Sequence, residues 1–269
     1  MRQLTCCALL SLTLTAAAAA DECEYSRPLD AELDAAGASG LFLDAAAGYL
    51  VIEGRPGGGP VVVEGRACAS QERRLDDIRL ETGRRGDTLV VEVDIPEMNF
   101  SWGGYARLDL KVTVPSDLDL RVRDGSGETR VSGVASLDLE DGSGEIHVAD
   151  VAGDVTIDDG SGELEVRDVT GRVRISDGSG EIEIRNVGEV HIEEDGSGEI
   201  DIAEVRGDVE IDSDGSGGIV VHDVIGGVTI GSDGSGSISV SRVSGGFELG
   251  SDGSGSVDVE DVEGTVRIP

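Results

Sequence analysis

The chain has few aromatic side chains and almost no lysine. Among its 269 residues are one Trp, three Tyr and three Phe, and Lys111 is the one lysine. This composition excludes a large core filled by rings, so any core must be thin and built from Val, Ile and Leu. Acidic residues outnumber basic ones by 55 to 21, which gives a net charge of −34. Such a charge argues against direct binding to nucleic acid or to an anionic lipid surface.

Long hydrophobic runs are also missing, except for a short one at the N-terminus. Arg2 precedes an apolar stretch from Leu4 to Leu14, and alanines at 16–20 offer small-residue cleavage sites. This pattern predicts a signal peptide over residues 1–20, so we expect export to the periplasm, the cell surface or the extracellular space. The apolar stretch is too short for a transmembrane helix, and no later segment qualifies.

Cysteine is scarce after the predicted signal peptide. Cys6 and Cys7 lie within it, which leaves Cys23 and Cys68. An even pair in an oxidising compartment favours one disulfide, with two separate buried thiols as the alternative.

Glycine is abundant, with 41 residues, and much of it belongs to a repeat. The tetrapeptide Asp-Gly-Ser-Gly occurs eight times, at spacings of 17, 18, 18, 18, 19, 19 and 19 residues. A period of this length and regularity predicts stacked coils. The copies begin at Asp124, Asp141, Asp159, Asp177, Asp195, Asp214, Asp233 and Asp252.

Each repeat divides into two halves of the form Asp-x-x-Gly-x-U-x-U-x, where U is aliphatic. The alternation predicts a short strand per half, with Ile182 and Ile184 pointing inward. We expect one turn at Asp-Gly-Ser-Gly and the other at the Gly of the second half, such as Gly171. A single coil buries too little to be stable, so the coils must stack. Residues 123–269 therefore predict an all-β fold, a β-solenoid of about eight 17–19-residue coils with two short strands per coil.

Residues 21–122 are less regular but still contain strand-like segments. Residues 45–52 match the half-repeat pattern with its Asp replaced. We expect a β-rich N-terminal cap, either irregular or built partly from degenerate coils, because solenoids need atypical terminal units. The last coil would leave an exposed strand edge, which favours self-association.

A family resemblance rests on the junction between these two regions. Residues 107–122 read RLDLKVTVPSDLDLRV and are followed by Asp-Gly-Ser-Gly-Glu and then by repeated V-x-G-x-V-x-I. The chain resembles the bacterial putative-adhesin domain family over most of its length after the signal peptide. The resemblance implies an exported β-helix with Ser-Gly coils, and it transfers no catalytic residue.

The eight Asp residues of the repeat form the sharpest candidate site. Stacked about 4.8 Å apart, their carboxylates would repel one another. Ca²⁺ bound between coils is one way to offset this repulsion. The other, which we favour, is that each Asp accepts turn N–H groups and caps the bend.

Residues 96–105 interrupt the strand pattern with three of the seven aromatics, Phe100, Trp102 and Tyr105. This loop is either a plug over the core or a binding loop for a sugar, a lipid or a protein partner. Repeated coils with minimal turns leave no catalytic cleft, so we expect no enzyme and no required cofactor. The sequence thus predicts a non-catalytic structural or adhesion-like scaffold of the bacterial envelope that binds some envelope or cell-surface component. The alternative is a Ca²⁺-dependent envelope binding protein.

Overall fold

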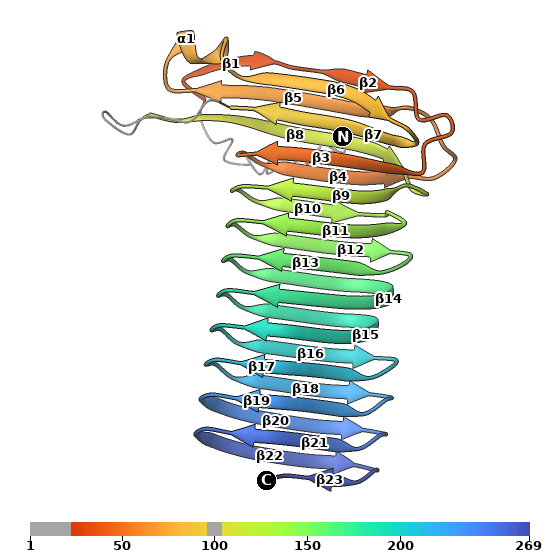
Figure 1. The fold of residues 1–269 in the computed structure, drawn as a ribbon, viewed down its shortest axis with the longest axis vertical. Coiled ribbons are helices and arrows are strands. Elements are labelled where there is room, and N and C mark those ends of the chain that lie inside the picture. The colour runs from red at the N-terminus through yellow and green to blue at the C-terminus, as the bar shows by residue number, and fades with distance from the viewer. Residues whose placement is uncertain (1–22, 96–103) are drawn as a thin grey trace, which may run out of the picture.

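A computed structural model describes residues 23–95 and 104–269 as a rod of stacked coils with a broader β cap at one end (Figure 1). The all-β fold and the β-solenoid of about eight coils are therefore confirmed. Each coil contributes one strand to each of two opposite faces. Within the described ranges, no helix is both long and apolar enough to span a membrane.

The first face contains, in spatial order from the cap, β6 (Arg79–Arg85), β7 (Thr88–Asp94), β3 (Gly40–Ala46), β9 (Asp119–Asp124), β11 (Ser136–Asp141), β13 (Val155–Asp159), the second halves of β14 (Leu164–Asp177) and β15 (Ile182–Asp195), β17 (Val209–Asp214), β19 (Val228–Asp233), β21 (Phe247–Asp252) and β23 (Val266–Arg267).

The second face contains β1 (Tyr25–Pro28) and β2 (Ala31–Leu33), both paired with β5 (Val61–Ala69), and then β8 (Ala106–Pro115), β4 (Leu50–Arg55), β10 (Thr129–Ser132), β12 (Ile146–Val151), the first halves of β14 and β15, β16 (Ile200–Val205), β18 (Ile219–Val224), β20 (Gly236–Val243) and β22 (Gly255–Val262). A single helical turn, α1 (Glu72–Leu75), lies between β5 and β6.

The N-terminal third contains both degenerate coils and a cap. Strands β3 and β4 form a coil on which the regular repeats stack, because β3 pairs with β9 and β4 with β10 in parallel. On its other side β3 pairs with β7 and β4 with β8. Beyond these, β5 and β6 pair in antiparallel fashion with β8 and β7 and close that end of the rod. A disulfide joins Cys23 to Cys68 in β5, with the two Cα atoms 5.3 Å apart.

The core is the thin aliphatic interior that the alternation predicts. Ile182 and Ile184 are fully buried, and Phe247 is buried in an equivalent inward position. Parallel register keeps like residues stacked, so Ile182 pairs with Leu164 on one side and Ile200 on the other. At the far end β22 pairs only with β20 among the described strands, and self-association through this edge stays a prediction.

The two corners of a coil are built differently. At the Asp-Gly-Ser-Gly corner, Gly144 has a φ of +147° and an added Cβ would lie 1.6 Å from the carbonyl oxygen of Gly127. At the second corner Asp168, not Gly171, takes the left-handed conformation, with a φ of 58°. The chain also bends at the glycine of this corner in other coils, as at Gly153 and Gly207, so the sequence placed the corner but did not identify its left-handed residue. Asp tolerates left-handed backbone, whereas Gly171 is needed because an added Cβ would lie 2.6 Å from the Gly153 carbonyl oxygen.

Candidate functional site

The eight Asp residues of the repeat form one straight column inside the rod. Each ends a strand of the first face, and the parallel register pairs each with the next. Seven of them are between 1% and 7% exposed. Asp252, in the last full coil, is only half-buried. They point inward because each stands two residues after an inward aliphatic, or three where the coil has gained a residue.

Turn amides cap one oxygen of the first five carboxyl groups, Asp124 to Asp195, as the structural alternative proposes, whereas neither oxygen of Asp214 or Asp233 has a partner among the described residues. The amide of Ser179 donates to Oδ1 of Asp177 at 3.2 Å, and the same contact recurs at other coils. In the first coil Asp124 also accepts a hydrogen bond from the Thr129 hydroxyl at 2.8 Å. The second oxygen has no hydrogen-bond partner among the described residues at Asp141, Asp159, Asp177 and Asp195.

Burial raises the pKa of the seven carboxyl groups from Asp124 to Asp233, and neighbouring carboxylates raise several of them further. Burial and the charges of Asp124 and Asp159 raise the pKa of Asp141 to about 6. Burial and the charges of Asp195 and Asp233 raise the pKa of Asp214 to about 7. Bound protons can therefore offset part of the repulsion within the column. Ca²⁺ takes six to eight oxygen ligands, whereas each coil offers one carboxyl group beside aliphatic columns, so the arrangement favours protons over Ca²⁺.

The aromatic loop predicted from sequence is described only in part. Phe100 and Trp102 lie outside the described residues. Tyr105 is half-buried in the cap, where its hydroxyl accepts a hydrogen bond from the Glu24 amide at 3.0 Å. Its own amide donates to the Ser70 hydroxyl at 3.1 Å. Tyr105 thus ties the N-terminal segment to the cap.

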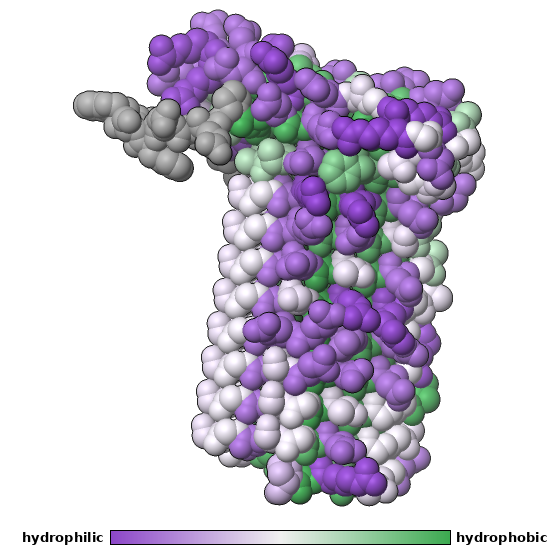
Figure 2. All heavy atoms as spheres, viewed as in Figure 1, coloured by the Kyte–Doolittle hydropathy of each residue, from purple (hydrophilic) through white to green (hydrophobic). Residues whose placement is uncertain are grey.

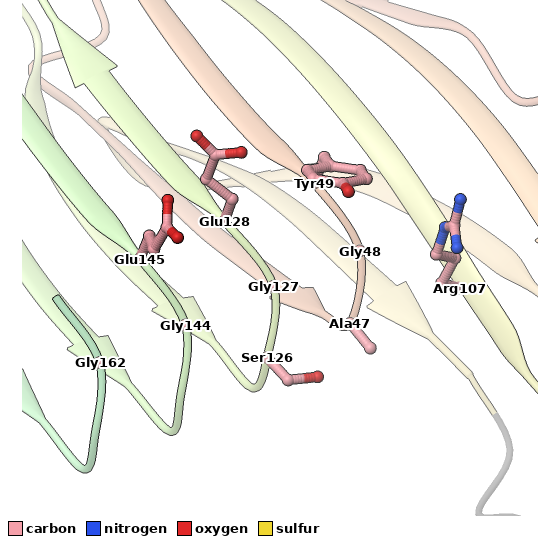
Figure 3. Close-up of a pocket in the computed structure, with 10 residues that line it drawn as sticks. All are labelled: Ala47, Gly48, Tyr49, Arg107, Ser126, Gly127, Glu128, Gly144, Glu145 and Gly162. Atoms are coloured by element: carbon pink, nitrogen blue, oxygen red, sulfur yellow. The ribbon is translucent and has the colours of Figure 1, made fainter. Parts of the chain in front are cut away.

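A cleft that the sequence did not predict lies where the cap coil meets the first regular coils (Figure 3). It has a volume of about 650 Å³. At this junction a degenerate coil meets a regular one, because β4 pairs with β10. The residues that line it are Ala47, Gly48, Tyr49, Arg107, Ser126, Gly127, Glu128, Gly144, Glu145 and Gly162.

An aromatic ring lies between opposite charges in this cleft. Tyr49 is 43% exposed. The Arg107 guanidinium lies 5.8 Å from the centroid of the Tyr49 ring and 5.6 Å from that of Tyr105, both within cation–π range. Glu128 and Glu145 project from successive coils on the other side of Tyr49, as Figure 3 shows. The cleft therefore combines a ring face, hydrogen-bond donors and hydrogen-bond acceptors.

The coil register explains why these side chains meet. Leu50 pairs with Thr129, and Thr129 with Ile146, all pointing inward. The residues before them, Tyr49, Glu128 and Glu145, consequently form one column at the rim of the coil. In the next three coils this slot is Glu again, and in the last three it is Gly218, Ser237 or Ser256. Tyr49 is the one aromatic residue in this column, and its ring is a sequence signal for the site.

The three histidines lie on different coils and do not converge. His147 lies on β12, His191 on β15 and His222 on β18. Each contacts a different carboxylate: Glu165 for His147, Asp212 for His191 and Asp223 for His222. No three-histidine metal site forms within residues 23–95 and 104–269.

Comparison with known proteins finds similar solved structures at low identity. No protein-family model and no curated protein matches the chain. A putative adhesin from Bacteroides fragilis shares 12% identity and a TM-score of 0.43, over 89% of this chain and 96% of that one. A putative lipid binding protein from Parabacteroides distasonis shares 17% identity and a TM-score of 0.42, over 89% and 95%. A putative adhesin from Parabacteroides merdae shares 11% identity and a TM-score of 0.41, over 90% and 95%.

Proteins that carry the adhesin name are thus among the structural neighbours, in agreement with the resemblance noted in the sequence. At these identities and scores the likeness carries no argument about what this chain binds. We therefore base the function on the cleft itself.

Proposed function

We propose that the protein is an exported, non-catalytic, adhesion-like scaffold of the bacterial envelope, which binds a saccharide in the cleft at the cap junction. The observation that carries the proposal is the half-exposed Tyr49 ring between the Arg107 guanidinium and the carboxylates of Glu128 and Glu145. An aromatic ring offers an apolar face to a sugar ring, while flanking charged groups hydrogen-bond its hydroxyls.

The corner glycines support access to the cleft. Gly48, Gly127, Gly144 and Gly162 follow one another along its floor without side chains. The amides of these glycines donate to serine carbonyl oxygens of the next coil, so the glycines contribute space rather than hydrogen-bond donors. The stacked series of corners gives an elongated shape suited to a chain-like ligand. The rod of stacked coils extends away from the cap junction, so it would act as a spacer that carries the site at one end (Figure 1). Polar side chains cover much of the face of the rod that Figure 2 shows.

The placement of the acidic pair favours binding over hydrolysis. A glycosidase needs two carboxyl groups flanking the bond that is cleaved. Glu128 and Glu145 instead stand side by side on successive coils of one face (Figure 3). We therefore assign them to recognition of ligand hydroxyls.

Binding to a glycan array by the full exported chain tests the proposal. The array should include peptidoglycan fragments and neutral oligosaccharides. Tyr49→Ala is expected to weaken binding of any retained glycan at least tenfold, about 1.4 kcal/mol, because the ring face is lost. Ile225→Ala removes another exposed apolar side chain, 65% exposed and far from the cleft in sequence, and should bind like wild type. Absence of binding to every glycan, or equal binding by Tyr49→Ala, contradicts the proposal.

A further inference from the structure

His147 lies beside the cleft, surrounded by three glutamates. It stands on β12, and its side chain is 28% exposed. In-register pairing places Glu165 next to it on the following coil. Glu145 lies two residues earlier on its own coil, and Glu128 lies beside Glu145 on the preceding coil. Two of these carboxylates, Glu128 and Glu145, also line the cleft.

The contacts of the imidazole assign different roles to its two nitrogens. Nδ1 lies 2.9 Å from Oε2 of Glu165, a hydrogen bond in which Nδ1–H donates to the carboxylate. That bond leaves the lone pair on Nε2. Nε2 lies 3.8 Å from Oε1 of Glu128 and 3.7 Å from Oε2 of Glu145, too far for hydrogen bonds.

The spacing of these three atoms suits a metal ion between them. The ligand atoms of His147, Glu128 and Glu145 all lie within 4.8 Å of one another. Tetrahedral Zn²⁺, with bonds of about 2.0–2.2 Å, holds its ligand atoms roughly 3.4 Å apart. The two distances from Nε2 to the carboxylate oxygens exceed this value by a few tenths of an ångström. A carboxylate that binds the other ring nitrogen is the usual partner of a metal-bound histidine, and Glu165 occupies that position.

We propose that Nε2 of His147 and the carboxylates of Glu128 and Glu145 bind a divalent transition metal ion of the zinc class, with Glu165 as the orienting residue. Three protein ligands leave a fourth position open toward solvent, beside the cleft. The proposal does not depend on saccharide binding, since the metal ligands are complete without it.

The other histidines provide internal comparisons. Nε2–H of His191 donates to Asp212 at 3.0 Å, so this nitrogen has no lone pair free for a metal ion, although His191, Glu210 and Asp212 also lie close together. His222 holds Asp223 and Arg242 at its Nδ1, at 2.7 and 2.9 Å. Only around His147, among the described histidines, does one nitrogen bind a carboxylate while the other faces two more.

One cation already competes for the site. The Arg130 guanidinium pairs with Glu128, so a metal ion must displace this arginine or share the carboxylate with it. Arg130→Gln should therefore strengthen metal binding, which a site elsewhere on the acidic surface would not show.

Calorimetric titration of the full exported chain with Zn²⁺, without saccharide, tests the proposal. Wild type is expected to bind one equivalent saturably, His147→Gln to lose it, and Glu165→Gln to bind about 10–100-fold more weakly. Arg130→Gln should bind more tightly, and His222→Gln should match wild type, because His222 belongs to no comparable group of ligands among the described residues. Circular dichroism of each variant reports whether it is folded. No saturable binding by wild type, retention in folded His147→Gln, or loss in folded His222→Gln overturns the assignment.

Discussion

Replacement of Asp214 by asparagine should stabilise the protein at alkaline pH. Burial, Asp195 and Asp233 raise the pKa of the Asp214 carboxyl from 3.8 to about 7. The folded protein therefore holds a proton that the unfolded chain releases, and its stability falls as the pH rises from about 4 through 7. An asparagine at this position has no proton to lose, so this loss of stability should disappear.

The pKa shift of Asp214 sets an upper limit on the stability gained by Asp214→Asn. One pKa unit corresponds to about 1.4 kcal/mol, so the full shift of Asp214 amounts to roughly 4 kcal/mol. Sharing of protons along the column reduces this figure. The amide of the introduced asparagine also faces Asp195 and Asp233, which flank position 214 in the column. We expect a gain of about 2–4 kcal/mol in the free energy of unfolding at pH 8 and little change at pH 4.

Urea unfolding at pH 4 and pH 8 measures this difference. Glu194→Gln is the matched control, because Glu194 is exposed one residue before the buried Asp195 and its replacement removes the same charge from the surface. It should change the free energy of unfolding by less than about 0.5 kcal/mol at either pH. If Asp214→Asn instead destabilises the protein at pH 8, the ionised carboxylate itself stabilises the fold and the reasoning is refuted.

Two further predictions concern the coil corners and calcium. Gly144→Ala should cost more than about 4 kcal/mol or prevent folding, because its Cβ would meet the Gly127 carbonyl oxygen at 1.6 Å. Gly83→Ala is the control, because an added Cβ there meets nothing within 4 Å, and its urea midpoint should equal that of wild type. Equal losses of stability in the two variants would contradict the close contact between Gly144 and Gly127. Millimolar Ca²⁺ and a calcium chelator should both leave the melting temperature unchanged, since protons offset the charge of the column; a rise in Tm with Ca²⁺ would restore the calcium alternative.

The sequence predicts the local parts of the fold well. Ile182 and Ile184 point inward because a two-residue alternation defines the buried face of a strand. The Asp column follows in the same way from a period that stacks like on like. The sequence placed the second corner near Gly171 but did not identify Asp168 as its left-handed residue, because glycine and aspartate both tolerate that conformation.

The cleft depends on contacts that a repeat pattern does not contain. Tyr49 meets Glu128 because β4 pairs with β10, although β5 to β9 intervene between them in the chain. Nothing local in either segment specifies that pairing. The half-repeat match at residues 45–52 indicated that this segment could form a coil, but not which coil would stack on it.

The most direct test of the account is hydrogen–deuterium exchange of the full chain, with and without a glycan that the array identifies. We predict slower exchange on binding at residues 47–49 and 107 and at the successive corners 126–128 and 144–145, with no change in coils beyond residue 200. Protection confined to those distant coils, or spread evenly along the rod, would contradict a binding site at the cap junction.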